Sequence, residues 1–298
     1  MSGKYQVRKV RRDGVSQRYW VAPTREHDDA VIAVVSDDLA TTESREAQEL
    51  ARQLLQNPSV QELLYRSLVR HYEETKSFHW QPMLFLQHYL SRGYPEAESL
   101  LVRLATEPSN RHVKGASVYM IALSMGSRAP RLFREVADKA NDEWTARVAI
   151  DQLANCLIST MKNLIGKGIT PTREEILDTL ETLGLALQGK WFSTEGEMGS
   201  IIDALNYKRS EFERAAHGQI PDSVEKQVID GLVSALALRT TSDHDFGRIL
   251  NVIKEWSSEY ALSKLRSLSS GSLPHERRAK VIGAIQEIEH RLKRNSSQ

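Results

Sequence analysis

The densest group of side chains able to do chemistry lies within the first twenty residues. Five cationic and two aromatic residues flank Asp13-Gly14: Arg8, Lys9, Arg11, Arg12, Arg18, Tyr19 and Trp20. Cationic side chains beside aromatic rings suit contact with phosphate groups combined with base stacking, so this pattern indicates a nucleic-acid-binding element. The alternative is that the apolar neighbours dock on the rest of the chain, while the arginines are solvated or paired with acids.

The charge of the chain is unevenly distributed. Residues 1–25 hold seven Lys and Arg against Asp13 alone, and residues 26–75 hold eleven Asp and Glu against four Arg. The formal net charge of the whole chain is nevertheless +1. Such segregation serves an outside partner, or it lets the two segments attract each other. The near-neutral total argues against extended coverage of DNA, but not against a local basic arm.

A second group of candidate binding residues lies further along, on a predicted helix. Trp144 and Arg147 are about one turn apart, and Asp151 follows Arg147 by another turn. The run Trp-Thr-Ala-Arg-Val-Ala-Ile (144–150) resembles a Trp-x-x-Arg-x-Ala-Ile stretch on a DNA-facing helix of the HEAT-like alkylpurine DNA glycosylases. That family also carries an upstream Trp-Asp-x-x-Asp pattern with its catalytic Asp, whereas residues 105–125 here contain neither Trp nor Asp. No catalytic residue is therefore carried over, and an ion pair with Arg147 suffices to explain Asp151.

The remaining polar groups predict little chemistry. Asp243-His244-Asp245 could hold a metal ion, but an N-cap for a helix beginning near residue 245 explains it better. His79 and His88 lie nine residues apart, which places them on opposite faces of a helix. The single cysteine, Cys156, rules out a zinc site made of cysteines and an internal disulfide. P-loop, HExxH and Gly-x-Ser-x-Gly motifs are absent, so no cofactor is predicted and an enzyme is the less favoured interpretation.

The elements that must position these residues are mostly helices. From about residue 43 onward, apolar residues recur at helical spacing. Before that point, Asp13-Gly14 between two β-prone runs predicts a hairpin in which Arg12 and Arg18 approach each other across the turn. Residues 30–35 suit a third strand. After a break at Gly166–Gly168, Thr170-Pro171 predicts the N-cap and first turn of another helix.

Two of the predicted helices resemble each other. HVKGASVYMIALS (112–124) and TARVAIDQLANCL (145–157) align 33 residues apart, so that Lys114 falls on Arg147 and Ala116 on Ala149. A helix pair that recurs at this spacing is typical of an α-solenoid. The run 142–149 is similar to the opening of the second helix in HEAT-like repeats, and the resemblance covers about 55 residues. The resemblance implies a HEAT-like α-solenoid, and the alternative is a generic helical array. Either is a mainly α fold, to which the hairpin predicted at Asp13-Gly14 adds a small N-terminal β element.

These observations predict a domain organisation and a class of function. We expect residues 1–40 to form the basic β element and residues 41–294 the helical domain, with a sub-boundary near 166–170. Extended helical arrays present long binding surfaces, so the sequence favours a non-catalytic protein-binding, scaffold or inhibitory protein that uses the hairpin, Trp144 and Arg147.

Two alternatives stay open. One is a nucleic-acid-binding protein that uses the hairpin and a basic last helix, with Arg277, Arg278, Lys280, Arg291, Lys293 and Arg294. The other is an enzyme acting on DNA bases. No apolar stretch approaches the length of a membrane span, so no membrane partner is predicted. The lone cysteine favours a reducing, cytoplasmic location. The sequence predicts a protein partner and leaves its identity and the oligomeric state open.

Overall fold

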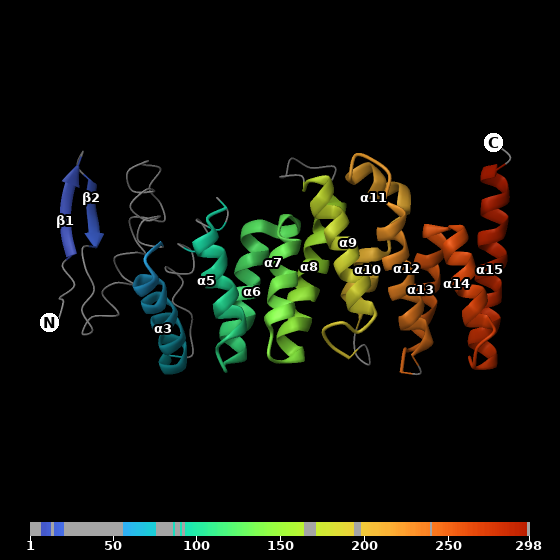
Figure 1. The fold of residues 1–298 in the computed structure, drawn as a ribbon, viewed down its shortest axis with the longest axis horizontal. Helices are drawn as coiled ribbons and strands as arrows, with labels where there is room; N and C mark the ends of the chain where they lie inside the picture. Colours follow the sequence, from blue (N-terminus) through green and yellow to red (C-terminus); the bar gives the residue numbers. More distant parts are fainter. Residues whose placement is uncertain are drawn as a thin grey trace. The chain divides into compact units, whose positions relative to one another are not determined.

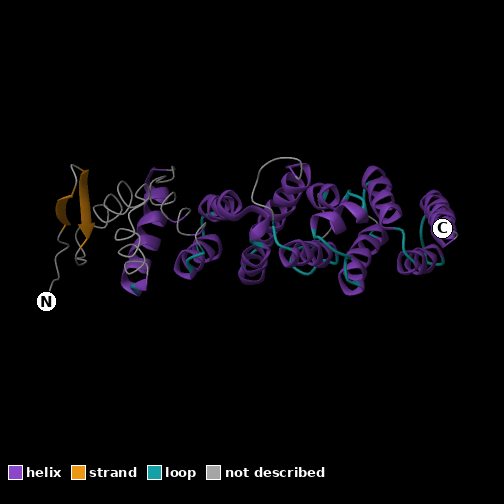
Figure 2. Ribbon diagram, turned by 90° about the horizontal axis from the view of Figure 1, so that it is seen from above, coloured by secondary structure: helices purple, strands orange, loops and turns teal. Residues whose placement is uncertain are grey.

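The structure is a computed structural model, and its described residues are mainly helical. It describes residues 7–12, 15–20, 56–75, 86, 90, 93–163, 171–193, 198–238 and 240–296. Within these ranges it contains twelve α-helices, a short 3-10 helix η1 (Gly126–Arg128) and two strands (Figures 1 and 2). The mainly α prediction is confirmed. The expected third strand at 30–35, His79 and His88 lie outside the described residues.

The chain forms two compact units. Unit 1 comprises Met1–Met125 together with Lys139–Asn141, and unit 2 comprises Gly126–Asp138 together with Asp142–Gln298. The domain limits expected from the sequence, 1–40 and 41–294, stay a prediction.

Unit 1 contains the two strands. β1 (Val7–Arg12) and β2 (Val15–Trp20) are antiparallel, and their register pairs Val7 with Trp20 and Arg12 with Val15. Arg18 lies opposite Lys9 and not near Arg12, so the expectation that Arg12 and Arg18 meet across the turn is wrong. The physical reason is that a two-residue connection pairs the residues adjoining it, which are Arg12 and Val15.

Unit 1 also contains three described helices that pack in succession. They are α3 (Pro58–Thr75), α5 (Pro95–Thr106) and α6 (Arg111–Met125), and α5 lies between the other two. Pro58 and Pro95 each open a helix, where the missing N–H of proline costs nothing. The apolar residues of α5 recur at helical spacing and are fully buried, among them Leu100, Leu101 and Leu104. Burial of this stripe is what holds α5 in place.

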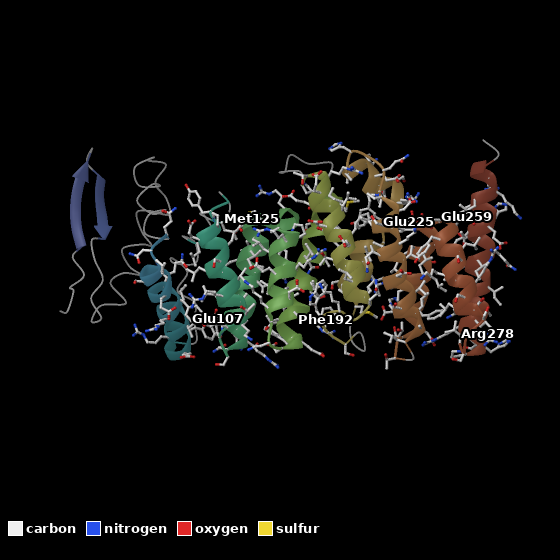
Figure 3. The ribbon with its side chains drawn as sticks, in the orientation of Figure 1. Glu107, Met125, Phe192, Glu225, Glu259 and Arg278 are labelled. Atoms are coloured by element: carbon white, nitrogen blue, oxygen red, sulfur yellow. The ribbon has the colours of Figure 1, made fainter. Side chains whose placement is uncertain are left out.

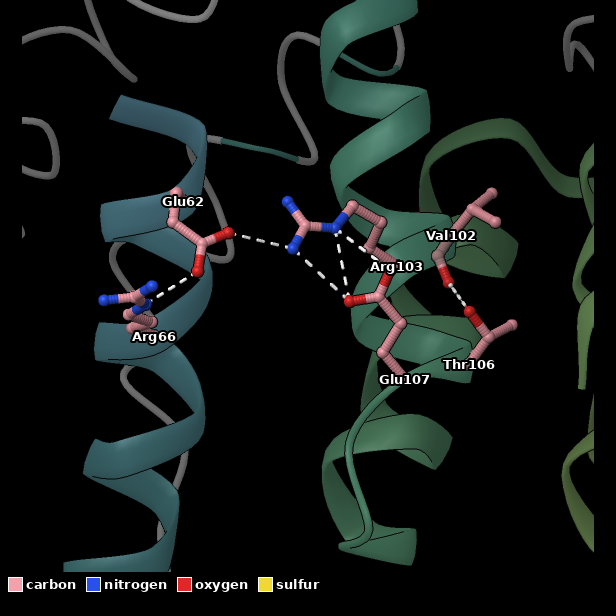
Figure 4. A network of polar contacts seen from close by, with 6 residues as sticks. All are labelled: Glu62, Arg66, Val102, Arg103, Thr106 and Glu107. Atoms are coloured by element: carbon pink, nitrogen blue, oxygen red, sulfur yellow. Dashed lines mark hydrogen bonds and ion pairs between the residues drawn. The ribbon is translucent and has the colours of Figure 1, made fainter. Parts of the chain in front are cut away.

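A polar network joins α3 to α5 inside unit 1 (Figure 4). Arg103 donates from Nη2 to Glu62 Oε2 at 3.0 Å and from Nε to Glu107 Oε1 at 3.2 Å. Arg66 Nε donates to the other oxygen of Glu62 at 2.6 Å, and the Arg103 guanidinium lies 4.5 Å from the centre of the Tyr65 ring. The hydrogen bonds from Arg103 and Arg66 lower the pKa of Glu62.

Unit 2 is built from nine described helices that follow one another along the chain (Figure 1). They are α7 (Pro130–Lys139, whose last residue is grouped with unit 1), α8 (Glu143–Asn163), α9 (Arg173–Leu187), α10 (Gly199–Leu205), α11 (Arg209–Ala215), α12 (Asp222–Ala237), α13 (Asp243–Trp256), α14 (Glu259–Ser269) and α15 (His275–Ser296).

The helices of unit 2 form two rows. In one row α9 packs on α12 and α12 on α14; in the other α8 packs on α10, α10 on α13, and α13 on α15. The rows also contact each other, as where α12 meets α13 and α14 meets α15. The fully buried aromatic side chains of unit 2 include Phe133, Phe212, Phe246 and Trp256. Polar side chains bridge neighbours within each row: Tyr260 donates to Asp230 at 2.9 Å, and Arg291 donates to Glu255 at 3.2 Å.

Two glycines lie where α9 and α12 approach each other closely. A Cβ added at Gly184 of α9 would lie 2.6 Å from the backbone oxygen of Gln227 in α12, and one added at Gly231 would meet the backbone oxygen of Gly184. Both helices therefore need residues without side chains at this crossing.

Helix starts in unit 2 follow capping signals that are visible in the sequence. Ser242 accepts from the backbone N–H of Asp245, which agrees with the N-cap predicted for this helix. The start predicted at Thr170-Pro171 is wrong, because α9 begins at Arg173 with Thr172 as its N-cap. Thr172 and Glu175 bond each other's backbone N–H in a reciprocal capping box, which satisfies two donors and outweighs the proline signal.

Candidate interaction surface

The candidate residues predicted on the hairpin fall on both strands of unit 1. Arg8, Lys9, Arg11 and Arg12 belong to β1, and Arg18, Tyr19 and Trp20 belong to β2. The register sets Tyr19 opposite Arg8 and Arg18 opposite Lys9. The side chains of these strands lie outside what the structure describes, so their role in binding stays a prediction.

The candidate residues predicted on the helix, Trp144 and Arg147, lie in the first two turns of α8 in unit 2. Trp144 is half-buried. Arg147 donates from Nη2 to the backbone oxygen of Ser193 at 2.9 Å, and its guanidinium lies 4.9 Å from the centre of the Phe192 ring. Arg147 therefore holds the connection after α9 against the start of α8.

A cavity opens beside this contact. It has a volume of about 420 Å³ and is lined by residues 189–193, which follow α9, with Glu143 at the start of α8 and Leu238 at the end of α12. Phe192, labelled in Figure 3, is a buried lining residue, whereas Trp191 is half-buried. Three helix ends thus contribute to one hollow within unit 2.

The indole ring of Trp191 is fixed by two contacts. Its Nε1 donates to Asp138 Oδ1 of α7 at 2.6 Å, and the ammonium group of Lys190 lies 4.4 Å from the ring centre. Lys190 Nζ also lies 3.2 Å from Asp138 Oδ1, so one carboxylate holds both side chains. A ring held in this way loses little conformational freedom on binding a partner.

The charges around the cavity differ in how they are compensated. Lys190 pairs with the Asp138 carboxylate, whereas Arg147 bonds the neutral backbone oxygen of Ser193 and keeps its positive charge. Glu143 is exposed and has no hydrogen bond or ion pair with any residue that the structure describes. The walls formed by Trp191, Phe192 and Leu238 are apolar. Among the described residues, the lining therefore combines these apolar side chains with the charged side chains of Glu143 and Lys190.

The basic residues of the last helix, α15, are partly committed to contacts within unit 2. Arg277 donates to Asp243 at 3.0 Å, Arg278 to the backbone oxygen of Gly271 at 2.8 Å, and Arg291 to Glu255 of α13 at 3.2 Å. Lys280, Lys293 and Arg294 have exposed side chains. At least three of the six basic residues that suggested nucleic-acid contact on this helix thus make bonds within unit 2.

The other polar groups considered from the sequence have structural explanations. Asp245 and Asp243 accept from Arg248 and Arg277, and no group of potential metal ligands gathers anywhere in the described ranges. Burial raises the pKa of the Cys156 thiol to about 11, so the reactive thiolate is scarce at neutral pH. Asp151 accepts from Ser200 of α10, a bond between neighbouring helices that the sequence did not reveal.

None of the helices within the described ranges has the length and apolar character needed to cross a membrane.

Comparisons with known proteins do not assign a family. No protein-family model and no curated protein matches the chain. Among solved structures, the chain aligns with a computationally designed, self-assembling cyclic protein homooligomer. That alignment has 16% identity, covers 90% of this chain and 92% of the other, and has a TM-score of 0.19. A TM-score this low carries no argument about fold or function.

Sequence reasoning missed most of the residues that line the cavity. Trp191 and Phe192 were visible as two aromatic residues in a connection after Gly189, and aromatic residues in a short connection are a usable signal for a surface site. Glu143, Lys190 and Leu238 gave no such signal, because nothing local indicates that residues 143, 190 and 238 meet.

Proposed function

We propose that the helical part of the chain is a HEAT-like repeat array. Two contacts at positions aligned in the sequence support this. Lys114 in α6 donates from Nζ to Asn141 Oδ1 at 2.6 Å within unit 1, and Arg147 in α8 donates to Ser193 within unit 2. Each basic residue bonds a group in the connection that precedes the next helix of its kind, α8 or α10. The same role at the same aligned position is what repetition of one structural unit predicts.

The function that we propose is non-catalytic binding of a protein partner, as a scaffold or as an inhibitor. The observation that carries it is the cavity beside Trp191. The Trp191 ring lines this cavity and is held by Asp138 and Lys190. Rigid aromatic side chains in pockets are the residues that most often dominate the binding energy of protein interfaces. A volume of about 420 Å³ suits one or two side chains of a partner.

Affinity capture from the native host with matched variants tests this function. The full chain, Trp191→Ala and Ile282→Ala are used as baits, because Ile282 is also an apolar residue with an exposed surface but lies on α15. We expect a protein that is retained by the full chain and by Ile282→Ala and lost with Trp191→Ala. Calorimetry with the purified partner should then show about a tenfold or greater weakening for Trp191→Ala alone. A partner bound equally well by Trp191→Ala would exclude this surface.

Nucleic-acid binding is a second candidate function, favoured by the basic residues of β1 and β2. A titration of labelled single- and double-stranded DNA and RNA at two salt concentrations tests it, with the triple variant Arg11→Gln, Arg12→Gln, Arg18→Gln beside the full chain. Binding that falls steeply with salt and weakens in the variant would support this candidate. Absence of binding to all four probes would remove it.

A further inference from the structure

We propose that the outer face of α15 pairs with the same face of a second copy of this chain, with the two helices antiparallel. α15 ends the row formed by α8, α10 and α13, and its inner side packs on α13 and α14 (Figure 1). Val281 and Ile288 are fully buried on that inner side. The inference goes beyond the proposed function, because the residues that line the cavity beside Trp191 do not belong to α15.

The middle of the outer face is uncharged. Its exposed residues fall within about 100° of one another around the helix, and they are Ala279, Ile282, Gly283 and Gln286. Ile282 is 44% exposed, and a Cβ added at Gly283 would meet nothing within 4 Å. Lys280 is exposed at the edge of this face, about 100° from its centre. The outermost helix of an array is expected to turn a polar face to water, whereas small and apolar residues let a neighbouring helix come close.

The two ends of the same face carry opposite charges. Glu276 is exposed in the first turn of α15, and Arg294 is exposed in its last turn, next to the exposed Lys293. Residues 276 and 294 are five helical turns apart, about 27 Å, so both lie on the same side of the helix. Neither Glu276 nor Arg294 has a hydrogen bond or ion pair with any residue that the structure describes.

Antiparallel pairing of two copies satisfies these charges. A two-fold axis near residue 285 sets Glu276 of each copy opposite Arg294 of the other, because a two-fold interface uses the same surface twice. Parallel pairing would set like charges together. The dipole of a helix already favours an acid at its start and cations at its end, and the same polarity favours an antiparallel neighbour. The occupant that matches both the uncharged middle and the reversed ends is therefore the same helix of another copy.

Sedimentation equilibrium of the full chain with charge-reversal variants tests this inference. We expect the unsubstituted chain to show a reversible monomer–dimer equilibrium. Glu276→Arg alone, or Arg294→Glu alone, sets like charges at both contacts of the dimer and should raise its dissociation constant about fivefold or more. An equal mixture of these two variants restores opposite charges at both contacts. It should therefore associate at least as tightly as the unsubstituted chain.

Two further variants complete the test. Ile282→Glu brings two carboxylates together in the uncharged middle and should abolish the dimer. Glu174→Arg is the control, because Glu174 is also an exposed acid in the first turn of a long helix, α9, and should leave the dissociation constant unchanged. All of these positions are exposed, so circular dichroism should show the same helix content in every variant.

Three results would overturn the inference. One is a monomer of 33.8 kDa at every concentration of the unsubstituted chain. Another is a dimer that Glu276→Arg and Arg294→Glu leave as stable as before. The third is a mixture of these two variants that associates no more tightly than either alone. Each of them leaves the proposed function untouched, because that function depends on capture of a partner through Trp191.

Discussion

Gly184 and Gly231 bring the backbones of α9 and α12 into direct contact, because a Cβ on Gly231 would collide with the backbone oxygen of Gly184. We predict that Gly231→Ala lowers the free energy of unfolding by about 1–3 kcal/mol, since the helices must separate to admit a methyl group. Gly247→Ala in α13 is the control. A Cβ there meets nothing within 4 Å, so it should raise stability by about 0.5–1 kcal/mol through better helix propensity. Urea unfolding measures both variants, and equal effects would contradict a tight crossing.

His217 adopts a left-handed backbone conformation, with φ of 49°, at the end of α11. This region suits glycine, and the residue after His217, Gly218, donates back to Glu213 as in a glycine-terminated helix. His217→Gly should raise the free energy of unfolding by about 0.5–1 kcal/mol, since relief of strain exceeds the added chain entropy. His217→Ala should bring no such gain, because it retains a Cβ. Thermal unfolding separates the two, and an equal gain from alanine would point to the imidazole instead.

Glu225 is 5% exposed in α12, and its carboxylate pairs with Arg209 of α11, whose Nη1 lies 2.5 Å from Glu225 Oε2. Arg209→Met should lower the free energy of unfolding by about 2–4 kcal/mol, because it leaves a buried carboxylate without its partner. The double variant Arg209→Met, Glu225→Leu should recover most of that loss. A double-mutant cycle in urea measures the coupling. Additive losses in the double variant would mean that the pair does not interact.

The pH dependence of unit 1 should carry the signature of Glu62. Its pKa is lowered by the hydrogen bond from Arg103 first and by Arg66 second. A carboxylate with a lowered folded pKa adds stability above its unfolded pKa of about 4.3, and that stability is lost as the pH falls through the folded value. Because the Glu62 side chain is 39% exposed and screened by solvent, the contribution should be under about 1 kcal/mol.

Chemical unfolding of Glu62→Gln between pH 3 and pH 7 measures this contribution. The difference from the unsubstituted chain should be largest at neutral pH and vanish in acid. Glu96→Gln, at a half-exposed acid in the first turn of α5, is the control. A difference that grows as the pH falls would reverse the sign and reject the assignment.

The sequence by itself determined the helical class and many helix limits. Apolar residues at helical spacing predicted the helices, and the run at residues 243–245 predicted an N-cap where one of them begins. These features are local, because a cap or a first-turn proline acts within four residues. Where two signals competed, as at Thr170-Pro171 and Thr172, the reciprocal bond between Thr172 and Glu175 decided the start.

Only the tertiary structure decided which residues meet. Glu143, Trp191 and Leu238 line one cavity although they lie on three different helix ends, and Arg147 was predicted as a binding residue but bonds Ser193. Gly231 stands in the middle of a helix, where sequence alone indicates a weak helix former and nothing of a close crossing. Such relationships depend on how helices cross, and the crossing is set by packing between surfaces that no local pattern contains.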